Sequence, residues 1–124
     1  MSPRRLAWQD GKRAEAWARW WLRLKGYAIL AQGRRGKRGS GAGEIDIIAR
    51  RGGIIAFVEV KHRCDRQTAA HAITPAQRRR IAIAAQSFMA DNPHLGRCTM
   101  RFDAILMAPG RWPCHISDAW QMDA

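Results

Sequence analysis

The sequence predicts a single α/β domain in which a mixed central β-sheet is flanked by helices. A chain of 124 residues has the length of one domain with one hydrophobic core. Two segments carry apolar residues at helical spacing, and the apolar segments between and after them have the composition of β-strands. The predicted order is helix, three strands, helix, strand and a short last strand, in one domain that covers residues 1–124.

Residues 8–25 are predicted to form the first helix. Their apolar side chains recur at i, i+3, i+4, i+7 and i+8, which places them on one face, and Trp20 points away from it. The predicted members of this face are Ala14, Trp17, Ala18, Trp21 and Leu22. Gly26 is placed to end the helix, and residues 27–30 are predicted to form a short strand.

Residues 32–43, QGRRGKRGSGAG, are predicted to form a flexible, positively charged loop. The segment contains five glycines and four cations and lacks apolar anchors. Two roles stay open for it: an arm that contacts phosphates, or the solvated tip of a hairpin. The four cations are Arg34, Arg35, Lys37 and Arg38.

A second helix is predicted to start within Thr74-Pro75-Ala76-Gln77. Thr74 suits the N-cap, proline suits the first position, and Gln77 can complete a capping box. Asn92-Pro93 should end this helix, and residues 101–107 and 115–120 are predicted to form the last two strands. The predicted buried face of the helix consists of Ile81, Ala84, Ala85, Phe88 and Met89.

Carboxylates interrupt the two most apolar predicted strands, residues 44–49 and 54–61, where acidic residues are uncommon. If these strands pair antiparallel across a short turn, Asp46 faces either Phe57 or Glu59. In both registers Asp46, Glu59 and Lys61 project from one face of the sheet, with Glu44 beside them. The carboxylates should therefore lie close together.

Clustered carboxylates repel one another and raise each other's pKa unless a cation lies among them. Lys61 can neutralise one of the three, so a divalent cation held by one or two carboxylates, water and a substrate phosphate is a natural solution. The alternative is a solvated sheet face with an ordinary glutamate–lysine pair. The Ile/Val-rich surroundings of Asp46 and Glu59 favour the metal site.

The composition points to a polyanionic partner. The net charge of +12 and the pI near 11.3 favour binding to nucleic acid. Three widely spaced cysteines and four histidines without metal-ligand spacing predict neither a zinc site nor a disulfide framework. The apolar runs are too short to cross a bilayer and no secretory signal is visible, so a cytoplasmic protein is expected.

The acidic motif carries a resemblance to known families. Asp46, followed thirteen residues later by Glu59-x-Lys61, resembles the active-site signature of the PD-(D/E)XK nuclease superfamily. More closely, GEIDIIA followed by FVEVKHR resembles the YraN-like family of uncharacterised bacterial proteins, which is held to be related to Holliday junction resolvases. The resemblance covers nearly the whole chain, including G-x-x-x-E-x-x-A at residues 11–18 and RFD at residues 101–103.

The resemblance implies a restriction-endonuclease-like fold and a role for each matching residue. Asp46 and Glu59 would bind Mg²⁺ or Mn²⁺, and the carbonyl of Val60 would complete the shell. Lys61 would orient or activate the attacking water, or stabilise charge on the phosphorane. Glu15 matches an acid on the first helix that reaches toward the same metal in resolvase-like relatives, with an ordinary surface glutamate as the alternative.

Two further residues match family positions but have structural explanations. Gln77 occupies a helix position where some superfamily members keep a polar active-site residue, yet its capping role already accounts for it. Asp103 of RFD is expected to form a salt bridge with Arg101 or another basic group.

The function expected from these observations is metal-dependent hydrolysis of phosphodiester bonds in nucleic acid, with DNA favoured and branched DNA included. A resolvase-like enzyme would act as a homodimer. The alternative is a nucleic-acid-binding module that keeps the nuclease fold without cutting.

Overall fold

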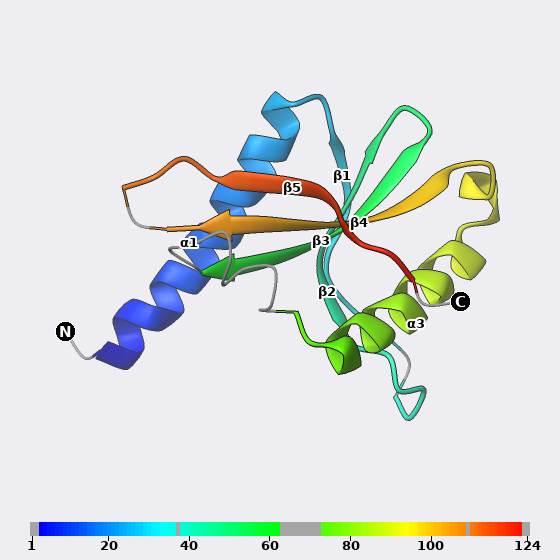
Figure 1. Ribbon diagram of the computed structural model, residues 1–124, viewed down its shortest axis with the longest axis horizontal. Helices are drawn as coiled ribbons and strands as arrows, with labels where there is room; N and C mark the ends of the chain where they lie inside the picture. The colour runs from blue at the N-terminus through cyan, green and yellow to red at the C-terminus, as the bar shows by residue number, and fades with distance from the viewer. Residues whose placement is uncertain (1–2, 37, 63–72, 109, 123–124) are drawn as a thin grey trace.

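A computed structural model of the chain describes residues 3–36, 38–62, 73–108 and 110–122, with side chains from Lys12 onward. These residues form two α-helices, a short 3₁₀-helix and one five-stranded sheet, which confirms the predicted α/β class (Figure 1). The elements are α1 (Pro3–Leu24), β1 (Ala28–Arg35), β2 (Glu44–Arg51), β3 (Ile54–His62), α3 (Pro75–Asp91), η1 (Pro93–Leu95), β4 (Thr99–Met107) and β5 (Cys114–Trp120).

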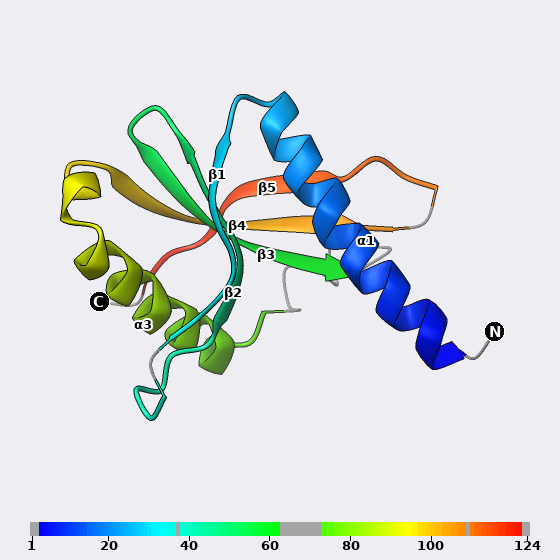
Figure 2. The ribbon, with the colours of Figure 1, turned by 180° about the vertical axis from the view of Figure 1, so that it is seen from behind.

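The strands follow one another in the sheet in chain order, from β1 to β5. Strands β3 and β4 are parallel because the chain passes through α3 between them, and the other neighbouring pairs are antiparallel. Alternate residues of β3 contribute to two separate cores. Ile55 and Phe57 pack with α3, whereas Ala56 and Val58 pack with α1. The two helices therefore cover opposite faces of the sheet, and Figure 2 shows α1 lying across one of them.

The core on the α3 side is aromatic. The Phe57 ring contacts Phe88 of α3 edge-on, with centroids 6.1 Å apart, and Phe102 of β4 at 5.7 Å. Phe102 in turn stacks on Trp120 at 5.5 Å, which joins the last strand to the core. Four of the five residues predicted to face the core from α3 are buried, and Met89 packs against them partly exposed.

The core on the α1 side is built from small residues, and one prediction about it is wrong. Ala14, Ala18 and Leu22 are buried against the sheet, but Trp17 is 52% exposed rather than part of the apolar face. The two alanines form a narrow contact stripe at i and i+4, and it leaves the bulky indole beside the interface rather than in it.

The start of α3 has the predicted capping box. The Gln77 backbone N–H donates to the Thr74 hydroxyl at 3.2 Å, and the Gln77 side-chain oxygen accepts from the Thr74 N–H at 3.2 Å. This reciprocal pair satisfies two N–H groups at the end of the helix. Asn92 ends the helix, also as predicted.

The predicted glycine-rich loop starts later than expected. Strand β1 continues to Arg35, so Gln32, Arg34 and Arg35 pair with the first half of β2 instead of lying in a loop at residues 32–43. The glycines of this segment predict a loop. It forms a strand because β2, its partner, supplies the hydrogen bonds. At the other end of the connection, the Gly43 N–H donates to the Arg80 carbonyl of α3 at 3.0 Å.

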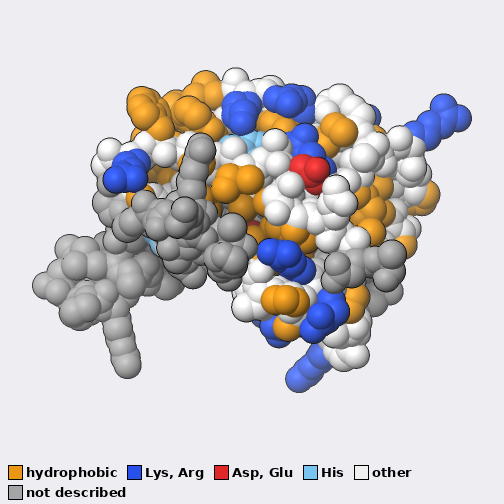
Figure 3. Space-filling model, viewed as in Figure 1, with side chains coloured by type: hydrophobic (Ala, Val, Ile, Leu, Met, Phe, Trp, Pro, Cys, Tyr) orange, Lys and Arg blue, Asp and Glu red, His pale blue; other side chains and the backbone are white. Residues whose placement is uncertain are grey.

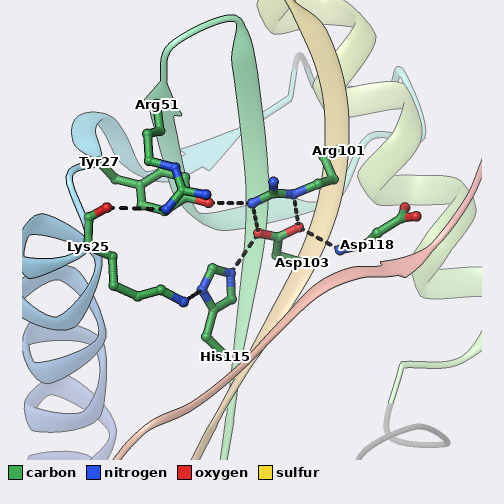
Figure 4. Close-up of polar contacts among 7 residues, drawn as sticks. All are labelled: Lys25, Tyr27, Arg51, Arg101, Asp103, His115 and Asp118. Carbon is green, nitrogen blue, oxygen red and sulfur yellow. Dashed lines mark hydrogen bonds and ion pairs between the residues drawn. The ribbon is translucent and has the colours of Figure 1, made fainter.

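Asp103 of β4 is the centre of a buried polar network (Figure 4). Both of its oxygens accept from Arg101 at 2.8 Å, which confirms the salt bridge expected from the RFD motif. His115 Nε2 lies 2.7 Å from the same carboxylate, and the Asp118 N–H donates to it at 3.0 Å.

The network continues from this carboxylate to the first helix. Lys25 Nζ lies 2.6 Å from His115 Nδ1, and Arg101 also donates to the Tyr27 hydroxyl. The contacts connect the end of α1 to the last two strands, so the network joins segments that are far apart in the sequence.

Candidate active site

The pairing of β2 with β3 brings Asp46 close to Glu59. The paired residues run from Arg51 with Ile54 to Ile47 with Val58, which is the tighter of the two registers that the sequence allowed. The pairs end at Ile47 with Val58, and Asp46 and Glu59 are the next residues along their strands, close enough for the charge of Asp46 to act on Glu59. The Asp46 carboxylate also accepts a hydrogen bond from the Val60 N–H at 2.9 Å, which fixes its orientation toward β3.

Glu59 is a buried acid with incomplete hydrogen bonding. It is 7% exposed, and no described residue forms a hydrogen bond with its Oε1 atom. Burial, followed by the charge of Asp46, raises its pKa to about 8, although Lys61 opposes this shift. A buried acceptor left without a partner costs free energy, so this position favours a proton or a cation.

Asp46 is perturbed in the same direction. Burial raises its pKa to about 6, against the hydrogen bond from Val60, and the negative charges of Glu15 and Glu44 add to the rise. Glu15 of α1 is therefore close enough to influence Asp46 electrostatically. The two neighbouring carboxylates disfavour simultaneous ionisation unless positive charge joins them.

Lys61 brings positive charge to this pair. Its Nζ atom lies 3.8 Å from Glu59 Oε2, and its side chain is 20% exposed. The two residues are two positions apart in β3, so they project from the same face of the strand. The ammonium is close to the carboxylate but does not form a hydrogen bond to its second oxygen.

The remaining predicted acidic and polar residues lie at the edge of this arrangement or outside it. Glu44 is exposed and forms an ion pair with Arg35 at 3.5 Å. The side chain of Gln77 is engaged in the capping box of α3.

The described cations among the four predicted to contact nucleic acid lie in different surroundings. Arg34 forms an ion pair with Asp91 at 2.7 Å and lies over the Phe88 ring, so α3 holds its guanidinium. Arg35 is exposed in β1 and pairs with Glu44, and Arg38 is exposed in the connection between β1 and β2. Lys37 lies outside the described residues.

The acidic motif implies a magnesium ion at Asp46 and Glu59. Among the residues with described positions, no group of three His, Cys, Asp or Glu side chains is close enough to hold a metal. Mg²⁺, however, is usually held by one or two carboxylates together with water and substrate phosphates. Asp46 and the unsatisfied oxygen of Glu59 fit that pattern, because each has a pKa raised by burial and a like charge.

A hollow of about 660 Å³ was not predicted from the sequence. It lies between α1 and the β4–β5 connection, and Trp17, Trp112, Arg13 and Arg111 contribute to its lining. The signal available in the sequence was the number of tryptophans, six in 124 residues. Helical periodicity had placed Trp17 in the core instead.

None of the helices in the described ranges is long and apolar enough to cross a bilayer.

Comparison with known proteins shows the family of this chain. Residues 14–107 match the model of the uncharacterised protein family UPF0102. The chain belongs to UPF0102. This confirms the YraN-like resemblance, and the matched region contains Glu15, Asp46, Glu59 and Lys61.

Members of UPF0102 from other bacteria match almost the whole chain. A UPF0102 protein of Paramagnetospirillum magneticum is 55% identical over 94% of this chain and 91% of its own length. One from Methylocella silvestris is 49% identical over 97% of this chain and 94% of its own length. Another, from Parvibaculum lavamentivorans, is 46% identical over 93% and 84%. The names of these proteins give the family and no activity.

Proposed function

We propose that this UPF0102 protein is a metal-dependent hydrolase of phosphodiester bonds in nucleic acid, with an active site of the PD-(D/E)XK type. One observation carries the proposal: Glu59 is buried near Asp46, with a lysine 3.8 Å away and one oxygen that no described residue hydrogen-bonds. A purely structural carboxylate at this depth would be expected to have complete hydrogen bonding.

Asp46, Glu59 and the carbonyl of Val60 are the groups that would hold Mg²⁺ or Mn²⁺. The chemistry supplied by such an ion is a bound water of lowered pKa and charge neutralisation at the scissile phosphate. The Val60 N–H holds the Asp46 carboxylate in place at 2.9 Å, so the ligand is oriented before substrate arrives.

Lys61 supplies the fixed positive charge of the site. Its ammonium lies beside Glu59, within the part of the strand that a phosphate would approach, and it can donate hydrogen bonds to a water or to phosphate oxygens. It would thereby orient the attacking water or stabilise the negative charge that develops on phosphorus during hydrolysis.

The surface charge supports nucleic acid as the substrate. The net charge is +12, and the face in Figure 3 displays lysine and arginine side chains in several places with little acidic surface among its described residues. A phosphodiester polymer is the polyanion that such a surface would attract. DNA, including branched DNA, is the preferred substrate, and a homodimer would suit a four-way junction.

A nucleic-acid-binding module without catalytic activity is the second candidate. The observation in its favour is that the described residues contain no cluster of three potential metal ligands. Such a protein would bind nucleic acid and show no metal-dependent cleavage.

A cleavage assay separates these candidates. Labelled single strands, duplexes, flaps and four-way junctions are incubated with Mg²⁺ or Mn²⁺ and with wild type, Asp46→Asn or Lys61→Met protein. Asp118→Asn is the matched control, because it removes one negative charge from an exposed position of β5 where asparagine also tolerates the positive φ of 54°.

The expected result is cleavage by wild type and by Asp118→Asn, with activity abolished in the two site variants while DNA binding persists. Cleavage that survives in Asp46→Asn would remove the active-site assignment. Binding without cleavage by wild type, on every substrate and with both metals, would favour the non-catalytic module.

A further inference from the structure

The hollow between α1 and the β4–β5 connection has an unusual lining for a protein surface. Two tryptophans border it, and both are far from buried: Trp17 is 52% exposed and Trp112 is 73% exposed. Tryptophan is highly buried on average, so two such indoles beside one hollow present a large apolar surface to solvent. We call this hollow the tryptophan groove.

The two indoles are positioned by other aromatic side chains rather than by burial. Trp17 lies edge-on to Trp20, with ring centroids 5.4 Å apart, and Trp112 lies against Trp21 at 5.7 Å. Each exposed ring thus has a neighbour that restricts its orientation. Rings held in this way can act as platforms for a planar ligand.

The basic residues that line the tryptophan groove favour planar ligands that also carry negative charge. Arg13 lies four residues before Trp17 on α1, on the same side of the helix, and Arg111 directly precedes Trp112. None of the described residues that line the groove is acidic. Guanidinium groups next to aromatic rings suit a ligand that combines flat bases with phosphates.

The tryptophan groove lies on the α1 face of the sheet, at the end of β3. His62, which contributes to its lining, directly follows Lys61 in β3, and it pairs with Met107 of β4, another lining residue. Ala14 and Met107, which also line the groove, belong to the core on the α1 side. Because side chains alternate between the faces of a strand, Glu59 and Lys61 project from the other face of β3, where Ala104, the partner of Glu59, packs in the core on the α3 side.

We propose that the tryptophan groove binds unpaired bases of a nucleic acid strand by stacking them on Trp17 and Trp112, so that the substrate contains a single-stranded segment. This inference rests on the proposed function and narrows its substrate class. Bases inside a duplex are stacked on one another and cannot offer their faces to an indole, whereas unpaired bases can.

The test measures binding without metal, so that it does not depend on cleavage. Fluorescence anisotropy in EDTA compares a labelled oligothymidylate with a hairpin duplex of the same number of phosphates. The double variant Trp17→Ala/Trp112→Ala is compared with wild type and with Leu24→Ala. The latter is the control because Leu24 is another large apolar residue of α1, 62% exposed, that does not line the groove.

The double variant should bind oligothymidylate roughly tenfold or more weakly, since base stacking on an aromatic ring contributes substantially for each base. Its affinity for the duplex should change less than twofold, and the dependence of both affinities on salt should stay as in wild type, because no phosphate contact is removed. Leu24→Ala should resemble wild type with both ligands.

Three outcomes would overturn the inference. An equal loss of affinity for single strand and duplex would show that the tryptophans do not stack on unpaired bases. Unchanged single-strand binding would show that the groove does not take part. A change in sedimentation from dimer to monomer in the double variant, with no change in DNA affinity, would show that a second copy of the chain covers the groove.

The outcome of this test can be separated from that of the proposed function. If wild-type protein never cuts but loses its single-strand preference in the double variant, the groove assignment stands and the nuclease assignment fails. If wild type cuts and shows no preference for single strands in EDTA, the nuclease assignment stands and the groove assignment fails.

Discussion

Two buried carboxylates on neighbouring strands, Asp103 of β4 and Glu59 of β3, differ in how completely they are satisfied. Asp103 is fully buried and receives hydrogen bonds from Arg101, His115 and the Asp118 backbone. Burial alone would raise its pKa, but these contacts lower it to about 2. For Glu59 the balance is reversed, because burial and Asp46 raise its pKa to about 8.

The difference separates an acid whose charge is balanced within the fold from one whose charge is not. Asp103 joins elements of the chain and has its charge balanced by residues of the chain itself. Glu59 has one lysine at 3.8 Å and an oxygen without a partner among the described residues. A buried carboxylate of this kind adds nothing to the stability of the fold, and this observation supports the functional role that we propose for Glu59.

The largest expected effect on stability comes from removing the charge of Asp103. Asp103→Asn removes the charge that balances Arg101, whose side chain is only 18% exposed, and should destabilise the fold by about 3–5 kcal/mol, as for other buried pairs that lose one partner. Glu59→Gln should cost less than about 1 kcal/mol or stabilise the protein, since it removes repulsion with Asp46. Urea unfolding at pH 7 measures both, and equal losses in the two variants would contradict the comparison.

The pH dependence of stability should have opposite signs in the two regions. The pKa of Glu59 is raised from 4.5 to about 8, so its contribution is fully present below pH 4.5 and is lost as pH rises toward 8. The pKa of Asp103 is lowered from 3.8 to about 2, so its contribution is present above pH 3.8 and is lost as pH falls through 2.

Thermal unfolding in metal-free buffer from pH 2 to pH 9 tests these signs. Wild type should lose stability between pH 4.5 and pH 8, and Glu59→Gln should flatten that slope without changing the acid limb. A slope above pH 4.5 that stays the same in Glu59→Gln would show that Glu59 is not the group responsible.

The parts of the fold that depend on short-range chemistry were predictable. The capping box at Thr74 and Gln77 needs only residues within one turn, and it is present as predicted. The pairing of β2 with β3 was predictable because a short turn leaves few registers, and the observed pairs follow the tighter of these registers as far as Ile47 with Val58. The extension of β1 to Arg35 was missed because its partner strand, not its own composition, makes it a strand.

The parts of the site that depend on long-range contacts were not predictable from the sequence. Lys25 and His115 are 90 positions apart in the sequence, and their side chains meet at 2.6 Å. They meet because α1 packs against β4, and β4 pairs with β5. Helical spacing placed Trp17 on the apolar face, since periodicity gives the direction of a side chain but not the width of the surface that covers it. Because the contact between α1 and the sheet is narrow, Trp17 stays exposed and lines the tryptophan groove.

Adding metal should stabilise the folded protein, because the ion would balance the charges of Asp46 and Glu59 as Arg101 and His115 balance that of Asp103. If Asp46 and Glu59 hold Mg²⁺ or Mn²⁺, an ion concentration of 100 times Kd should stabilise wild type by about 2.7 kcal/mol. The gain should be larger at pH 8 than at pH 5, because protonated carboxylates bind the ion poorly. Calorimetric unfolding with each metal and with EDTA measures this gain, and Asp46→Asn should lose it while Asp118→Asn keeps it. Equal stabilisation of both variants would mean that the ion binds elsewhere.

The smallest expected effect concerns Glu15, which acts on Asp46 from α1. The negative charge of Glu15 raises the pKa of Asp46, with a smaller effect than burial. The Glu15 side chain is half-buried. Glu15→Gln removes a like charge, so the pKa of Asp46 should fall from about 6 toward its ordinary value of 3.8, with a gain in apo stability of a few tenths of a kcal/mol. A carboxyl ¹³C NMR titration of Asp46 between pH 3 and pH 9 follows this shift, with Glu44→Gln as the matched variant. Because Glu44 ranks below Glu15 in its effect, its removal should lower the pKa by less, and a larger shift in Glu44→Gln would show that the acid on α1 is only a surface glutamate.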